Sequence, residues 1–133
     1  MQYIIVYFIS LFTLCVLDYV WLGVIMKSAI AQWFGPLMRE QILRGPALAF
    51  YVLYTIAVVV FAIYPAYREQ SWYMAAGYGA LLGFTAYMTY DLTNWATLKS
   101  RPVAMVAPDI VWGTIVTALV ALVGYMVWTR YLA

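Results

Sequence analysis

The chain has 133 residues, of which 68% are hydrophobic and only 9% are charged, and its mean hydropathy is +0.90. Soluble domains contain about 25% charged residues, so this composition excludes a soluble protein with an ordinary surface. The formal net charge of +2 is too small to favour nucleic acid as a partner.

Four segments are each long enough to cross a bilayer, which takes about 20 apolar residues per helix. The first segment has no basic region before it and carries Asp18 within it, so we expect a spanning helix rather than a secretory signal. We predict an all-α membrane protein, a four-helix transmembrane bundle that forms one domain over residues 1–133. The predicted helices cover residues 3–26, 46–64, 73–98 and 103–128.

The first loop, residues 27–45, is long for a tight turn and is only moderately polar. Residues 29–34 and 37–44 are typical of short interfacial helices, separated by Gly35 and Pro36. Two interpretations stay open for this segment. It is either a connection that lies on the membrane surface or a lid over the polar residues described below.

Basic residues are distributed unequally between the two sides of the predicted bundle. The first and third loops together contain Lys27, Arg39, Arg44, Lys99 and Arg101, whereas the other side has Arg68 and Arg130. Because cytoplasmic loops carry the excess of Lys and Arg, we expect both termini outside. The outer side also carries a predicted aromatic belt. It consists of Tyr3, Tyr64, Tyr67, Trp72, Tyr73, Trp128 and Tyr131.

Three aspartates, Asp18, Asp91 and Asp109, each interrupt an apolar segment. A carboxylate in hydrocarbon costs at least roughly 2.5 kcal/mol, so three of them need a shared reason. Each lies eight or nine residues from a loop Lys or Arg, which predicts a common depth of roughly 12 Å at 1.5 Å per residue. If the last helix instead begins at Pro108, Asp109 is a first-turn acid that favours the helix dipole.

The helical faces are compatible with one polar cavity that holds all three aspartates and opens toward the cytoplasm. Small and polar residues form stripes at spacings of three and four, and close approach of the helices is the structural alternative for the glycines. On the third helix the stripe is Gly79, Gly83, Tyr87, Asp91 and Asn94. On the fourth it is Asp109, Gly113, Thr117 and Ala121. On the first it is Leu11, Cys15, Asp18, Trp21 and Leu22. The second helix offers Tyr51, Tyr54 and Thr55.

We expect Trp21, Tyr87, Asn94 and Trp112 in or beside the wall of this cavity. We expect Arg39, Arg44, Lys99 and Arg101 to form a basic rim above it, because all four belong to the same two loops.

Three ways to accommodate the aspartates stay open. A divalent cation could bind Asp18, Asp91 and Asp109, with hydroxyl, amide or water oxygens completing a hard-ligand shell. Lys99 or Arg101 could pair with them. Alternatively, one or two acids stay protonated and donate hydrogen bonds to neighbours such as Tyr87 or Tyr90. The chain has no histidine, which excludes His-ligated haem or zinc, and its single cysteine, Cys15, excludes an intrachain disulfide.

The catalytic motifs that are readable from sequence, such as a phosphate-binding glycine loop or a Ser-His-Asp set, do not occur. The pattern Asp-x-Val-Trp, in contrast, occurs twice, at residues 18–21 and 109–112. On the predicted topology the two copies run in opposite directions, which hints at an inverted pair.

Four segments, taken in order, resemble a known family. They are residues 17–23 (LDYVWLG), 49–54 (AFYVLY), 87–94 (YMTYDLTN) and 109–113 (DIVWG). The chain resembles the small four-helix bacterial membrane proteins of domain of unknown function 2177, over essentially its whole length. The resemblance implies a multi-pass protein of the bacterial inner membrane and implies no particular activity or substrate.

Three functions compete at this point. The first is a protein that binds or transports a small ligand, cation or proton at the aspartates, with self-association into a homodimer to complete a path. The second is an accessory subunit of a larger membrane complex. The third is a membrane enzyme that acts on lipid headgroups, so whether the chain is an enzyme stays open. The lipid bilayer is a partner in all three.

Overall fold

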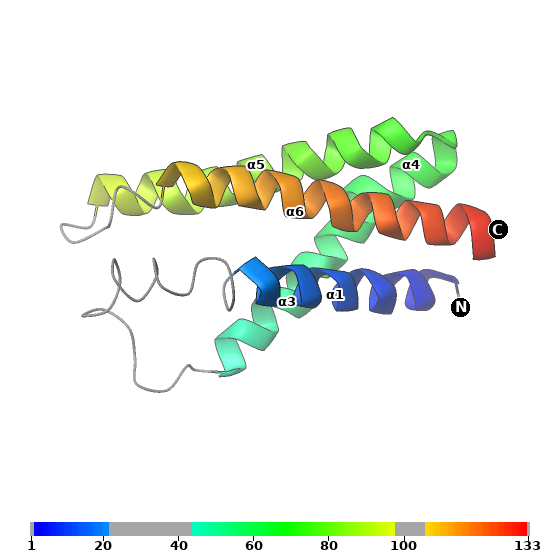
Figure 1. The fold of residues 1–133 in the computed structure, drawn as a ribbon, viewed down its shortest axis with the longest axis horizontal. Helices are drawn as coiled ribbons and strands as arrows, with labels where there is room; N and C mark the ends of the chain where they lie inside the picture. The colour runs from blue at the N-terminus through cyan, green and yellow to red at the C-terminus, as the bar shows by residue number, and fades with distance from the viewer. Residues whose placement is uncertain (1, 22–43, 98–105, 133) are drawn as a thin grey trace.

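The computed structural model describes residues 2–21, 44–97 and 106–132, and within these ranges the chain is helical with no β-strand. Four long helices pack together, as predicted (Figure 1). In chain order the elements are α1 (Gln2–Val20), α3 (Arg44–Val58), the π-helical turn η3 (Val59–Ile63), α4 (Tyr64–Glu69), α5 (Trp72–Thr97), α6 (Val106–Val127) and the π-helical turn η5 (Trp128–Leu132).

The helices lie in an antiparallel arrangement. α5 and α6 run side by side and form the most extensive contact in the described part of the chain. α1 packs along α6, and α3 crosses obliquely toward α4 (Figure 1). Both chain termini therefore lie at one end of the bundle, and the end of α1 that carries Asp18 lies at the other.

Among the described residues, three helical stretches are long and apolar enough to cross a membrane: Gln2–Val20, Gly45–Glu69 and Val106–Leu132. α5 is less apolar, but its 26 residues are also sufficient for a crossing. Several of its threonines satisfy their hydroxyls within the helix, for example Thr89 donating to the Thr85 carbonyl at 2.7 Å and Thr97 donating to the Thr93 carbonyl at 2.8 Å. α5 thus completes the four-helix bundle.

The second helix is longer than predicted, because it passes Tyr64 and continues through Pro65 to Glu69. Proline lacks an N–H, and its ring collides with the carbonyl four residues earlier in a regular α-helix. The π-turn η3 widens the backbone immediately before this proline, with the Tyr64 N–H bonded to the Val59 carbonyl. The helix ends at Gln70, whose φ of 51° is left-handed.

Several predictions fall outside the described residues. These are the end of the first helix toward residue 26, the interfacial helices within 29–44, and residues 98 and 103–105 of the third and fourth helices. Asp109 lies in the first turn of α6 as described, as in the alternative that starts this helix near Pro108. The predicted depth of Asp109 was counted from Arg101, and the residues between them are only partly described, so that depth stays a prediction.

Glycines allow α5 and α6 to approach closely. A Cβ added to Gly83 would lie 2.2 Å from the Gly113 carbonyl oxygen, and one added to Gly79 would lie 2.8 Å from the Thr117 carbonyl oxygen. Real Cβ contacts are longer than this, so no larger residue fits without separating the helices. The predicted stripes on the third and fourth helices therefore face each other.

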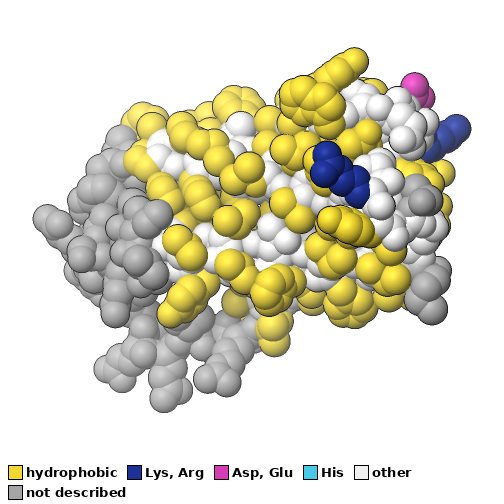
Figure 2. All heavy atoms as spheres, turned by 45° about the vertical axis from the view of Figure 1, so that its right-hand side comes forward, with side chains coloured by type: hydrophobic (Ala, Val, Ile, Leu, Met, Phe, Trp, Pro, Cys, Tyr) yellow, Lys and Arg dark blue, Asp and Glu magenta, His cyan; other side chains and the backbone are white. Residues whose placement is uncertain are grey.

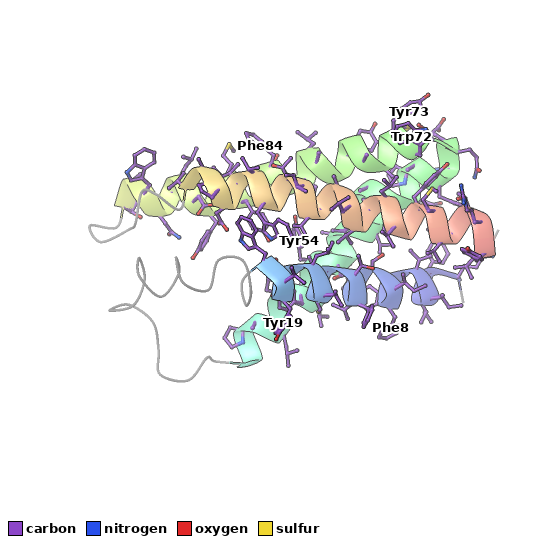
Figure 3. The ribbon with its side chains drawn as sticks, in the orientation of Figure 1. Phe8, Tyr19, Tyr54, Trp72, Tyr73 and Phe84 are labelled. Carbon is purple, nitrogen blue, oxygen red and sulfur yellow. The ribbon has the colours of Figure 1, made fainter. Side chains whose placement is uncertain are left out.

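The outer surface is apolar. Hydrophobic side chains predominate on the face in Figure 2, and the charged side chains visible there lie toward one end. In Figure 3, Phe8, Tyr19 and Phe84 point away from the bundle, whereas Tyr54 lies between the helices. A surface of this kind fits a lipid environment.

The end that carries the termini is closed around Trp128. This residue is only 1% exposed, so it is a core residue and not a member of the predicted aromatic belt. Tyr67 stacks on its indole ring with centroids 4.2 Å apart, and its Nε1 donates a hydrogen bond of 3.2 Å to Oε1 of Gln2. Trp72, Tyr73 and Tyr131 are exposed, as members of an interfacial belt should be.

Candidate functional site

Asp18 is held by hydrogen bonds from two other helices. Its side chain is 5% exposed, Tyr51 Oη on α3 donates to Oδ2 at 2.8 Å, and Trp112 Nε1 on α6 donates to Oδ1 at 2.9 Å. Each carboxylate oxygen therefore accepts one bond, which offsets part of the cost of removing this group from water. The carboxylate connects α1, α3 and α6 and has one preferred position.

The two copies of Asp-x-Val-Trp meet in space. The indole rings of Trp21 and Trp112 stack with centroids 4.6 Å apart and an angle of 4° between their planes. The two halves are not equivalent, because the buried Nε1 of Trp21 makes no hydrogen bond whereas that of Trp112 bonds to Asp18. The repeated motif thus forms one stacked pair between α1 and α6.

A cavity of about 420 Å³ lies beside Asp18, within the 300–1,000 Å³ range of small-molecule sites. All four long helices contribute to it, at the end of the bundle away from the termini. The described residues that line it are Asp18, Phe50, Tyr51, Ala86, Tyr87, Tyr90 and Asp109. Its lining therefore combines two carboxylates with four aromatic rings.

The aromatic wall is positioned by contacts behind it. Phe50 stacks on Tyr54 with centroids 5.1 Å apart, and the Tyr54 hydroxyl shares a hydrogen bond of 2.7 Å with the Thr117 hydroxyl. The Tyr87 ring occupies the space above Gly113, where an added Cβ would lie 2.1 Å from the ring. These contacts hold the rings at the cavity without filling it.

Not all the predicted site residues reach this cavity. Asp18, Asp109 and Tyr87 line it, and Trp112 and Trp21 adjoin it through Asp18 and the stacked pair. Asp91 is fully buried on α5, yet neither Asp91 nor Asn94 is among the described lining residues. The structure therefore brings two of the three aspartates together.

Asp91 lies on the same helix as three lining residues. The cavity meets α5 at Ala86, Tyr87 and Tyr90, and Asp91 is one turn beyond Tyr87 on the same face but is not among the described lining residues. Among the described residues, no three Asp, Glu, Cys or His side chains are grouped closely enough to hold a metal ion. Asp18, Asp91 and Asp109 thus do not form a common set of metal ligands here.

The predicted basic rim lies almost wholly outside the described residues. This applies to Arg39, Lys99 and Arg101. Arg44 begins α3, but its side chain is not described. The rim stays a prediction.

Two lining residues were not predicted from the sequence. Phe50 and Ala86 carry no polar atom, so neither stands out in an apolar helix. Tyr51 was expected among the residues that the second helix offers to the polar interior, and Tyr90 only as a hydrogen-bonding partner. One signal for this aromatic wall was present in the sequence. The second helix carries Phe50, Tyr51 and Tyr54 close together, although it has no acidic residue between its ends.

A family described as predicted membrane protein (DUF2177) matches residues 3–126 of this chain. The chain belongs to this family. The match confirms the resemblance found in the sequence, and it covers every described residue that lines the cavity. No curated protein and no solved structure gives a match.

Proposed function

We propose that this DUF2177 protein is an integral membrane protein that binds a small molecule in the cavity beside Asp18. The observation that carries the proposal is a nearly buried carboxylate, fixed by Tyr51 and Trp112, at the wall of a ligand-sized cavity. An ionisable residue inside a membrane bundle is costly and is usually kept for function. A purely structural polar core would gain more from filling the adjacent space.

We further propose that the cavity opens toward the cytoplasm of a bacterial inner membrane. The loops that join the helices at the cavity end contain five basic residues, against Arg68 and Arg130 at the opposite end. This imbalance favours a cytoplasmic position for the cavity end and a periplasmic position for both termini.

The proposal requires that a small solute enters the cavity. We would test entry with an Ala86→Cys variant in a Cys15→Ala background, because Ala86 lines the cavity and Cys15 is exposed. The probe is methyl methanethiosulfonate, a small neutral thiol reagent. A matched Ser10→Cys variant is the control, because Ser10 is fully buried and serine and cysteine are similar in size.

We expect the Ala86→Cys thiol to react at least tenfold faster than the Ser10→Cys thiol. Equal, slow reaction at both positions would show that the cavity is closed to solutes and would contradict the proposal. It would leave a structural role for Asp18, in keeping with an accessory subunit.

A further inference from the structure

We infer that the cavity selects an organic cation, a small molecule that carries a substituted ammonium group. This inference rests on the proposed function and adds the chemical class of the ligand. Three properties of the described lining carry it: the sign of its charges, its aromatic rings, and the hydrogen bonds that both oxygens of Asp18 already accept.

The described lining contains two charged side chains, and both are acidic. Asp18 and Asp109 come from different helices and face the same cavity, and no Lys or Arg is among the described residues that line it. Electrostatic interactions are far stronger in a low-dielectric interior than in water. The described lining therefore favours a cation over an anion such as a phosphate or a carboxylate.

The remaining surface is largely aromatic. Phe50, Tyr51, Tyr87 and Tyr90 contribute rings from α3 and α5, on two sides of the cavity. An aromatic face attracts a cation by about 0.5–2 kcal/mol, and groups of such rings recognise quaternary ammonium ligands. A lining of rings and carboxylates thus offers both attraction and an apolar fit to the methyl groups of such a ligand.

A divalent metal ion fits the same lining poorly. Ca²⁺ takes six to eight oxygen ligands and Mg²⁺ requires octahedral geometry, whereas rings supply no ligand of this kind. Both oxygens of Asp18 already accept hydrogen bonds from Tyr51 and Trp112. An organic cation needs no inner coordination shell, so it can be attracted by Asp18 without displacing these donors.

A second hollow in the bundle provides a useful contrast. It measures about 480 Å³, lies between α1 and the turn η3, and has no acidic residue in its described lining. Its lining residues are Tyr3, Ile4, Tyr7, Phe8, Ile56, Val59 and Val60. A surface of this composition suits a lipid tail. A hollow of similar size therefore forms in this bundle with no acidic residue in its described lining, so the acidic residues at the first cavity are not explained by its size.

The test uses the Ala86→Cys variant in the Cys15→Ala background with two charged reagents. One is 2-(trimethylammonio)ethyl methanethiosulfonate, and the other is 2-sulfonatoethyl methanethiosulfonate. Each rate is divided by the rate of the same reagent with free 2-mercaptoethanol, which removes intrinsic differences in reactivity. We expect the normalised cation-to-anion rate ratio to be at least 10 in the cavity.

The acidic residues should cause this preference. Adding Asp109→Asn should lower the ratio at least threefold, and so should Asp18→Asn, because the amide can keep the contacts with Tyr51 and Trp112 while it removes the charge. Tetramethylammonium chloride should slow the trimethylammonio reagent relative to sodium chloride at equal ionic strength. A ratio near 1, a ratio unchanged by Asp109→Asn, or no protection would each overturn the inference.

The two proposals fail in different ways. If neutral methyl methanethiosulfonate reacts rapidly but the charged reagents show no preference, the cavity still admits a ligand and only the cationic class is wrong. If the neutral reagent does not react at all, the proposed function itself is wrong.

Discussion

Trp112 on α6 donates its indole N–H to Asp18 on α1, with 2.9 Å between Nε1 and Oδ1. At the opposite end of the same helix pair, Trp128 donates its indole N–H to Gln2. The two tryptophans are separated by as many residues as the two acceptors are. This equal spacing is expected for two antiparallel helices, so the two hydrogen bonds mark the two ends of the contact between α1 and α6. Asp18 lies at one of these ends.

The hydrogen bonds of Asp18 predict how it tolerates substitution. In Asp18→Asn, the amide oxygen can accept from Trp112 and the amide NH₂ can donate to the Tyr51 hydroxyl, so both contacts persist. In Asp18→Ala, two partly buried donors lose their acceptor, at a cost of up to roughly 1–3 kcal/mol each. We expect thermal unfolding in detergent to show a much larger decrease in unfolding temperature for Asp18→Ala than for Asp18→Asn. Similar losses would contradict this account.

The stacked tryptophans provide a second matched pair. Trp112→Phe removes the N–H that bonds to Asp18, whereas Trp21→Phe removes a buried N–H that makes no hydrogen bond. Both changes keep an aromatic ring in the stack. We expect Trp112→Phe to reduce the free energy of unfolding by about 1.5–3 kcal/mol, the range for a bond to a charged group. Trp21→Phe should have a smaller effect, and the reverse order would refute the assignment.

Glycine substitutions test the contact between α5 and α6. A Cβ at position 83 would collide with the Gly113 backbone, so Gly83→Ala should cost roughly 1–3 kcal/mol, as overpacking does. Gly77 on the same helix has no neighbouring atom within 4 Å of an added Cβ. Gly77→Ala should therefore be neutral or stabilise the helix by about 0.5–1 kcal/mol. Equal destabilisation by the two variants would place the helix interface elsewhere.

The proposed orientation can be tested at the turn between α4 and α5. Glu69 is exposed at this turn, so a Glu69→Cys variant in the Cys15→Ala background presents one accessible thiol. We expect a membrane-impermeant maleimide to label it in intact cells, because the turn should be periplasmic. Labelling only after the membrane is permeabilised would show that the turn is cytoplasmic and that the proposed orientation is wrong.

The helix contacts that depend on small residues could be predicted from the sequence. Gly79, Gly83 and Gly113 repeat at helical spacing, and they mark the contact between α5 and α6. This works because only small residues permit backbones to approach so closely, whatever the surroundings. The four-helix architecture could be predicted from the length and apolarity of four segments. The family was indicated by the four short segments that resemble it.

The inward face of α1 could not be predicted correctly. The predicted stripe contained Leu11 and Cys15, but Cys15 is exposed and the buried residues are Val6, Ser10, Leu14 and Asp18. A membrane helix is apolar on all sides, so hydrophobicity does not distinguish the face toward lipid from the face toward protein. The clearest polar guide was Asp18, and counting back four and eight residues from it gives Leu14 and Ser10.

The position of Asp91 shows a related limit. Asp91 shares a stripe with Tyr87, which lines the cavity, yet Asp91 is not among the described lining residues. How far a cavity extends along a helix is set by how the neighbouring helices pack against it, which the sequence of α5 alone does not contain. Helical spacing therefore places a residue on a face, but it does not decide which turns of that face line the cavity.

The most direct test of the central claim is native mass spectrometry of the protein extracted gently from its own membranes. If Asp18 and the cavity bind a small molecule, the parent chain should carry an additional mass that dissociates on activation. Ala86→Phe, which fills the cavity, should lose this mass while it keeps the unfolding temperature of the parent. An identical mass on both proteins, or a parent chain found only as the bare polypeptide or in fixed stoichiometry with other proteins, would contradict the claim.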